Sequence, residues 1–434
     1  MNLGLPLSRI FMKSSGGKVK APTTLRLIVL VVFALGMTAV LRPTNSAAHI
    51  PITTKIMFDK EVIRILQRNC IACHRPGGAA FSLASYTDAR PWAKAIEVEI
   101  LEGRMPPWRP VKGFGDFANS PALTQQDTDL IVNWVENGVP EGDPKDLPKP
   151  PMFSDSWKLG DPDLILNTGQ SPAVKSGADE YATFTLSTGL KEDRWIGAMD
   201  LRPGNASIVR SATIYLRRSG EAGAEKKSGQ LEELATWVPG QVPFSAHNAG
   251  WLLPVGSQLV VKMHYRGSDE QSDQPGTDVS QLGIYLMKKP PRNELVSAAV
   301  ACSAGCPDET IPVTTSPRRV EAEYTLPQTE DVVAVHPAVN PLIVSVQATA
   351  YKPDGGQQIL LWSTGYGLGW AQDYYLRRPE KLAKGTRIEV TAYFDNSDNN
   401  RNNPNRPAAQ VKWTDAGLGP LCSFLMARPE SSPY

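Results

Sequence analysis

One ten-residue stretch, NCIACHRPGG at residues 69 to 78, restricts the fold and chemistry of this 434-residue chain more than any other. Cys70 and Cys73 are separated by two residues, and His74 follows at once. This pattern occurs in redox-active dithiols, in zinc sites and at points where haem is attached covalently. The three interpretations require different surroundings, so the flanking sequence decides among them.

The first 48 residues have the layout of an export signal or a membrane anchor. Residues 1–26 are basic with no acidic residue, and residues 27–41 then form an uncharged, mostly apolar run. This run is shorter than the about 20 residues that span a bilayer, and Ser46 and Ala48 offer small residues to a signal peptidase. Arg42, directly after the run, instead favours a retained anchor. In both cases we expect the rest of the chain outside the cytoplasm.

The surroundings of the motif favour haem. A thioredoxin-like dithiol lies between a strand and a helix, whereas here residues 59–69, DKEVIRILQRN, have the spacing of an amphipathic helix. A zinc site needs a second Cys/His pair nearby, and the next His or Cys is His247. The remaining interpretation is a haem held by thioether bonds from Cys70 and Cys73, with His74 as the proximal iron ligand.

A sixth iron ligand is available in the segment EGRMPPWRP, residues 102–110. Two prolines follow Met105 and rigidify the backbone, so that a thioether can be held at the iron without a helix. Met57 precedes the motif and Met152 lies beyond the expected domain, so neither competes well for this position. The alternative is that Met105 is a core methionine. His/Met ligation fills both axial positions and favours electron transfer over oxygen activation.

The segments CIACHRPGG and MPPWRP resemble the signature motifs of the monohaem cytochrome c domains of exported bacterial proteins. The resemblance covers about residues 55–153 and implies a small helical domain at residues 50–150, with His74 and Met105 as axial ligands. Apolar spacing independently predicts helices at residues 89–103 and 124–138.

A charged, proline-rich linker at residues 140–151 ends this region. Beyond it, alternating apolar runs such as SQLVVKMHY and GTRIEVTAYFDNS predict antiparallel β-sandwiches of jelly-roll type. The length fits two of them, at residues 158–295 and 310–434, with a break near residues 290–307. The predicted fold class is therefore multidomain, α plus all-β.

The two-sandwich region resembles the copper type II, ascorbate-dependent monooxygenases. The segments that carry this resemblance are DPDLIL, RPGNASIVRSATIYL, LPVGSQLVVKMHYRGSDEQSD, YKPDGGQQILLW, GTRIEVTAYFDNSDNNRNNPN and VKWTD. Members of that family have two jelly-roll domains, hold one copper in each and hydroxylate C–H bonds with oxygen. Bacterial members are often fused behind this type of cytochrome, so the resemblance implies a haem-fed copper hydroxylase as one function.

The first copper site implied by this resemblance has lost most of its ligands. Arg210 and Ser211 stand where the family has two adjacent histidines. His264, in the MHY segment, is the histidine that remains, and His247 is expected to be a plain loop histidine.

The second implied copper site is similarly incomplete. His336 takes the first place of a His-x-His pair, but Ala338 stands in the second. Leu421 or Cys422 stands where the family has its methionine ligand. Copper needs converging imidazoles or thiolates, so we expect no copper and regard His264 and His336 as remnants, with a new site at His336 as the alternative.

The other cysteines suggest structural roles. Cys302 and Cys306 can close a small disulfide in an oxidising compartment, and Cys422 is expected to be a buried thiol. A formal net charge of +1 indicates neither a nucleic-acid partner nor long-range steering to a charged one.

The sequence therefore predicts an electron carrier rather than an enzyme: one covalent haem c on a copperless pseudo-monooxygenase scaffold. We expect it on the periplasmic side of the bacterial inner membrane, anchored, or soluble after signal cleavage. Its expected partners are a membrane-bound electron-transfer complex, such as a photosynthetic reaction centre or a respiratory complex, and a small redox carrier protein. The alternative is a haem-fed, copper-dependent hydroxylase with degenerate copper sites.

Overall fold

The computed structural model describes residues 55–151, 157–218, 231–245, 248–267, 275–304, 306, 310–338, 341–365, 372–412 and 420–429. The predicted export segment (residues 1–48, with its apolar run at 27–41) lies outside these ranges, as do His49, Met152 and His247. Among the described residues, no helix combines the length and the apolar character needed to cross a membrane.

All the helices described lie within residues 58–146, and the last of them lies in the predicted linker. They are the π-helix η1 (Phe58–Val62), α2 (Ile63–Asn69), α3 (Tyr86–Ala89), the 3-10 helix η2 (Arg90–Trp92), α4 (Ala93–Leu101), α5 (Gln125–Glu136) and the 3-10 helix η3 (Pro144–Asp146). At the start of α5 the Thr124 hydroxyl accepts a hydrogen bond from the Asp127 backbone N–H at 3.1 Å, which is an N-cap. Gly138 follows the helix at φ 84°, so the helix predicted for 124–138 is confirmed at both ends.

Aromatic and aliphatic side chains of η1, α2 and α5 pack together. Phe58, Leu66, Ile131 and Trp134 are fully buried. The rings of Phe58 and Trp134 lie 5.8 Å apart, and the Trp134 indole N–H donates to the Pro140 carbonyl at 3.0 Å. The indole thus joins α5 to the chain that leads into the linker.

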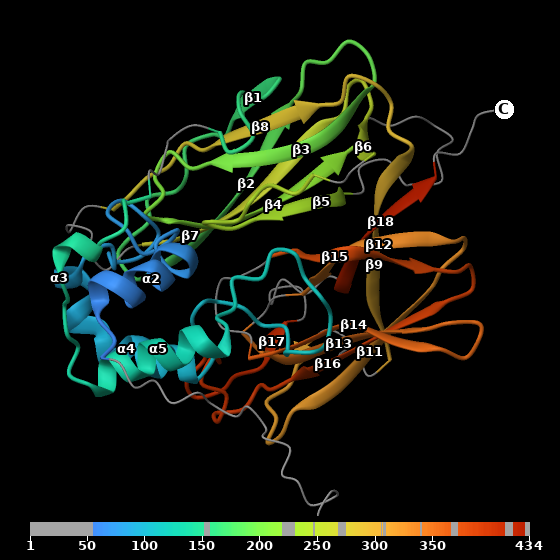
Figure 1. Ribbon diagram of the computed structural model, residues 1–434. Coiled ribbons are helices and arrows are strands. Elements are labelled where there is room, and N and C mark those ends of the chain that lie inside the picture. The colour runs from blue at the N-terminus through green and yellow to red at the C-terminus, as the bar shows by residue number, and fades with distance from the viewer. Residues whose placement is uncertain are drawn as a thin grey trace, which may run out of the picture. The chain divides into compact units, whose positions relative to one another are not determined.

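The rest of the described chain is built from strands, so the fold is mostly β (Figure 1). The strands are β1 (Leu164–Asn167), β2 (Asp179–Ser187), β3 (Arg194–Arg202), β4 (Val209–Arg217), β5 (Leu231–Trp237), β6 (Ala249–Leu253), β7 (Gln258–Arg266), β8 (Gln281–Leu286), β9 (Asn293–Ala304), β10 (Thr310–Ile311), β11 (Arg318–Thr325), β12 (Glu330–Pro337), β13 (Ile343–Tyr351), β14 (Gln357–Thr364), β15 (Tyr374–Leu382), β16 (Arg387–Phe394), β17 (Val411–Lys412) and β18 (Pro420–Pro429).

The strands pair into several sheets, as expected for β-sandwiches. In the first half, one sheet has the order β1-β8-β3-β6 and another β2-β7-β4-β5, and we call these two the first sandwich. In the second half, one sheet has the order β11-β16-β13-β14, and another, which we call the shared sheet, has the order β15-β12-β18-β9. We call these two the second sandwich. Strand β9 occupies the stretch where the sequence predicted a break, and it pairs with β6 at one end and β11 at the other.

Both faces of the shared sheet are buried. Tyr374 lies in one hydrophobic core and its neighbour Tyr375 in the other, and Phe424 and Leu425 are divided in the same way. Successive residues of a strand point to opposite faces, so a near-continuous apolar run such as LCSFLMA, residues 421–427, fits a strand with two buried faces. The shared sheet therefore contributes to two cores at once.

The asparagine-rich segment after β16 is held by a side-chain network. Asn396 is fully buried, and its Nδ2 donates to the carbonyl oxygens of Ile311, Pro312 and Ala409 at 3.2, 3.2 and 2.9 Å. Its Oδ1 accepts from Asn403 Nδ2 at 2.9 Å. One amide thus ties together two segments of the second sandwich.

Asn396→Ala should therefore lower the free energy of unfolding by about 2–4 kcal/mol, because it leaves several buried carbonyls without a donor. Chemical denaturation measures this loss. The matched control is Asn399→Ala, an exposed asparagine of the same segment, which should change stability by less than about 0.5 kcal/mol. Equal effects would show that the network does not hold this segment.

Candidate functional site

The Cys-x-x-Cys-His motif forms a tight turn at the end of α2. The Cys70 backbone N–H still donates to the Leu66 carbonyl at 2.8 Å. The Cys70 carbonyl then accepts from the backbone N–H groups of Cys73 and His74, at 3.1 and 2.9 Å. The structure thus brings all three residues of the motif together on one turn.

The two thiols of the motif are free, although a disulfide forms elsewhere. Cys302 and Cys306 are bonded to each other, as their spacing suggested, whereas Cys70 and Cys73 are not. Burial raises the pKa of Cys70 to about 12 and that of Cys73 to about 11. Redox-active dithiols have lowered pKa values, so these thiols lack that property.

His74 has one ring nitrogen held and the other available. Its Nδ1 lies 3.1 Å from the Phe81 carbonyl oxygen, and because a carbonyl can only accept, Nδ1 carries the hydrogen. Nε2 then presents its lone pair. Burial lowers the pKa of His74, which favours the neutral imidazole that binds metals. The ring packs edge-on against Phe81 at 4.8 Å, and Phe81 stacks on Trp92 at 4.3 Å.

Met105 lies just beyond α4, and its backbone N–H donates to the Glu99 carbonyl at 3.1 Å. In the part of the chain that the structure describes, no hydrogen bond or ring contact joins it to the motif. Its side chain is 37% exposed, and those of Trp92 and Leu101 are 44% and 59% exposed. The apolar face predicted for this helix is therefore largely at the surface, and the fully buried residues of α4 are Ala93 and Glu97.

The motif contacts the loop that follows β5. Cys73 Sγ lies 3.6 Å from the Pro239 carbonyl oxygen, and a Cβ at Gly240 would stand 2.8 Å from the Ala72 methyl. The positive charge of Arg210, on β4, lowers the pKa of Cys73 against the larger effect of burial. Arg210, one of the residues at the copper site that the sequence resemblance implies, thus lies close to the motif.

His264, the remaining histidine of the first implied copper site, is paired with a carboxylate. It lies on β7 opposite Ser211 of β4, and its Nε2 is 2.7 Å from Asp179 Oδ1. Its ring stacks on Tyr181 at 4.6 Å. Burial lowers its pKa despite the carboxylate. A single imidazole in this setting fits a structural histidine.

His336, by contrast, lies in a cluster of three possible metal ligands. It is on β12, and Glu233 of β5 and Asp373, just before β15, join it so that one ligand atom of each lies within 4.8 Å of the others. Burial disfavours its charged form, but the two carboxylates together raise the pKa of His336 to about 9.

Cys422 is fully buried on β18 opposite Pro337, as expected for a structural thiol.

Sequence reasoning missed Glu233 and Asp373. No local motif marks either residue, and they lie far from His336 in the chain. The three residues come together because β5, in one sheet, packs against the shared sheet that contains β12 and β15, and the sequence pattern does not specify this packing.

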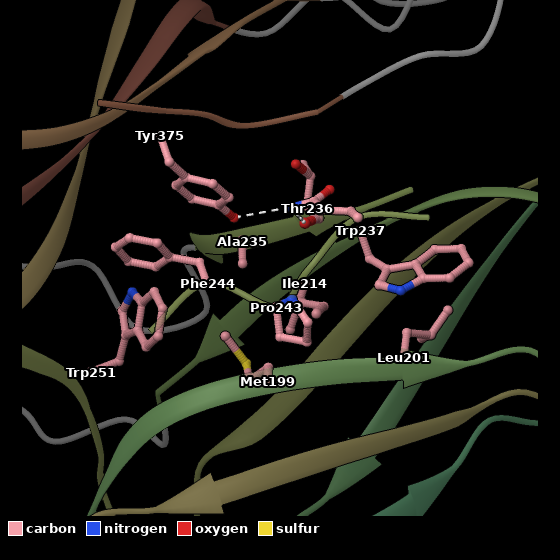
Figure 2. Close-up of a pocket in the computed structure, with 11 residues that line it drawn as sticks. Met199, Leu201, Ile214, Ala235, Thr236, Trp237, Pro243, Phe244, Trp251 and Tyr375 are labelled. Atoms are coloured by element: carbon pink, nitrogen blue, oxygen red, sulfur yellow. Dashed lines mark hydrogen bonds between the residues drawn. The ribbon is translucent and has the colours of Figure 1, made fainter. Parts of the chain in front are cut away.

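Figure 2 shows an apolar pocket that is lined in part by Tyr375, a residue that contacts the cluster. Phe244, Trp251 and Tyr375 gather on one side of it, with Met199 and Leu201 below. Phe244 stacks on Tyr375 at 4.3 Å. The Tyr375 hydroxyl donates to Asp373 Oδ2 at 3.0 Å, so a residue that lines the pocket is hydrogen-bonded to the cluster.

Comparison with known proteins identifies no family. No family model matches the chain, and no curated protein matches it. Solved structures with partial likeness include an allantoicase (13% identity, 50% of this chain and 76% of that one, TM-score 0.17). Others are PNGF-II (9%, 62% and 66%, TM-score 0.29) and the major capsid protein P2 of bacteriophage PM2 (12%, 55% and 99%, TM-score 0.23). These scores are too low to support an argument.

The contact between the motif and the first sandwich can be tested at Gly240, whose φ is +84°. Gly240→Ala should destabilise the protein by about 1–3 kcal/mol more than Gly189→Ala, because the new methyl overlaps Ala72. Gly189 also has a positive φ, +68°, but a Cβ there meets nothing within 4 Å. Both variants incur the backbone cost, so their difference in unfolding free energy isolates the contact. Equal losses would mean that the motif does not lie against this loop.

Proposed function

We propose that this protein is an electron-transfer cytochrome c that carries one electron on a single covalent haem c. Cys70 and Cys73 would form the thioether bonds, and His74 and Met105 would be the axial iron ligands. When bound, the haem supplies a one-electron couple that the polypeptide lacks.

The arrangement of His74 carries this proposal. A metal-binding histidine commonly donates its other ring N–H to a carbonyl or carboxylate, which fixes the tautomer and the ring plane. The Phe81 carbonyl has this relation to Nδ1, so Nε2 carries the lone pair that can bind iron, on the same turn as two thiols.

Three further observations support covalent haem over the other uses of the motif. The two thiols are not bonded to each other, so both are open to thioether formation. Among the described residues, the cluster of metal-ligating side chains does not include them. Trp92, Leu101 and Met105 are exposed apolar side chains on and next to α4, and such a surface suits an apolar macrocycle.

The β-sandwiches would act as the scaffold that positions the cytochrome against its partner. The pairing of His264 with Asp179 and the replacement of the neighbouring ligands by Arg210 and Ser211 support a copperless role for the first sandwich.

We propose further that the protein is held on the periplasmic face of the inner membrane by residues 27–41. There it would exchange electrons with a membrane-bound complex or a small redox carrier. Tethering raises the effective concentration near such a complex, which fits a chain whose net charge of +1 provides little electrostatic steering.

Met105→Ala tests the electron-transfer assignment. A thioether stabilises ferrous over ferric haem, so the variant should keep its haem but lower the midpoint potential by on the order of 0.1 V. The sulfur-to-iron charge-transfer band should disappear, and the ferrous protein should bind carbon monoxide. Potentiometric titration and optical spectroscopy measure these changes.

Met57→Ala is the matched control, because Met57 lies before the motif, and it should leave spectrum and potential unchanged. An unchanged spectrum in Met105→Ala would remove Met105 as the ligand. Ready binding of carbon monoxide by the wild type would mean an open iron and would favour an enzyme over an electron carrier.

A further inference from the structure

The cluster of Glu233, His336 and Asp373 joins two parts of the fold. Glu233 belongs to β5 of the first sandwich, and the other two belong to the shared sheet and the residue before it. Their side chains are 16%, 14% and 7% exposed. The backbone carbonyl of Glu233 also accepts a hydrogen bond from Ser297 Oγ on β9, so β5 lies directly against the shared sheet.

The distances in the cluster suit metal ligation better than hydrogen bonding. His336 Nδ1 lies 3.2 Å from Asp373 Oδ1, yet within the described chain Nδ1 makes no hydrogen bond of acceptable geometry. His336 Nε2 is 3.9 Å from Glu233 Oε1, which is beyond hydrogen-bond range. Two ligand atoms each about 2.1 Å from one ion at the tetrahedral angle lie roughly 3.4 Å apart, close to the separation of Nδ1 and Oδ1.

A second set of contacts fixes the orientation of Asp373. Its Oδ2 accepts from the Thr236 backbone N–H at 2.7 Å and from the Tyr375 hydroxyl at 3.0 Å. Tyr375 in turn accepts from Gln241 Nε2 at 3.2 Å (Figure 2). Outer contacts of this kind position the ligands of metal sites. They leave Oδ1, the oxygen that faces His336, for the ion.

The charges in the cluster also favour a divalent ion. Glu233 and Asp373 carry two negative charges when ionised, and a dication with a neutral imidazole balances both. With a single proton on His336 and both carboxylates ionised, the three side chains keep a net charge of −1 in a largely buried site, where Lys262 is a nearby positive charge. One nitrogen and two carboxylate oxygens form a donor set that zinc accepts, whereas copper favours additional imidazole or thiolate.

We propose that Glu233, His336 and Asp373 bind one divalent transition-metal ion of the zinc class and so clamp the first sandwich to the shared sheet. One carboxylate oxygen of Glu233 already lies within 4.8 Å of the other two ligand atoms, and binding of the ion would draw it closer. Three protein ligands leave a fourth position for water. This site is separate from the motif at Cys70–His74 and does not depend on haem.

The full, haem-loaded chain is first treated with a chelator to remove bound metal and is then titrated with zinc. Calorimetry and metal analysis should give one zinc per chain, counted separately from haem iron. The unfolding temperature should rise with zinc concentration, because the ion binds the folded state. His336→Gln and Asp373→Asn should each weaken zinc binding at least about 10-fold and abolish this rise.

His264→Gln is the matched control, because His264 also pairs with one carboxylate on a strand of the fold but lacks a third ligand. It should bind zinc like the wild type. Circular dichroism confirms that each variant is folded, and the nearly isosteric Asp373→Asn provides the second variant if His336→Gln fails to fold. Absence of zinc binding in the wild type, or equal binding by wild type and His336→Gln, would overturn the proposal.

Discussion

The burial of both faces of the shared sheet is the constraint on which the rest of the β structure depends. Tyr374 and Tyr375 are neighbours in the chain, yet each packs into a different core. A shift of one residue in the register of β12 or β15 would exchange the two faces, so the register is strongly specified. The same register directs His336 toward the first sandwich, where Glu233 lies. The metal-ligand cluster is thus a consequence of the packing that joins the two cores.

The motif at the end of α2 is instead held by contacts between residues that are close in the sequence. Its turn is closed by backbone hydrogen bonds to Cys70, and His74 is oriented by a carbonyl only seven residues away. Its link to the β structure is through the loop after β5, next to Arg210. Strand β5 therefore has two roles, since it carries Glu233 and leads into the loop that touches the motif. Under the two proposals, β5 would support the haem-binding motif through this loop and would carry a ligand of the ion that clamps the two sandwiches.

The sequence predicted the elements that depend on neighbouring residues: a helix, the strands and one disulfide. The helix at 124–138 followed from a cap and a glycine, and the strands followed from alternation between turn residues. The disulfide between Cys302 and Cys306 followed from their spacing. The contacts of Glu233 and Asp373 could not be predicted, because they arise where β5 packs against a different sheet, formed by strands far away in the chain. The exposure of the apolar face of α4 was missed for a related reason: periodicity shows that a face is apolar but not what covers it.

The chemical state of Cys70 and Cys73 decides whether the protein carries haem c, and one measurement reports it directly. The chain is produced in a host that matures c-type cytochromes, denatured and analysed by mass spectrometry, intact and after proteolysis. We expect the polypeptide, from its observed N-terminus, to carry the added mass of one haem, located on the peptide that contains both cysteines. Two free thiols or a disulfide on that peptide would contradict this expectation.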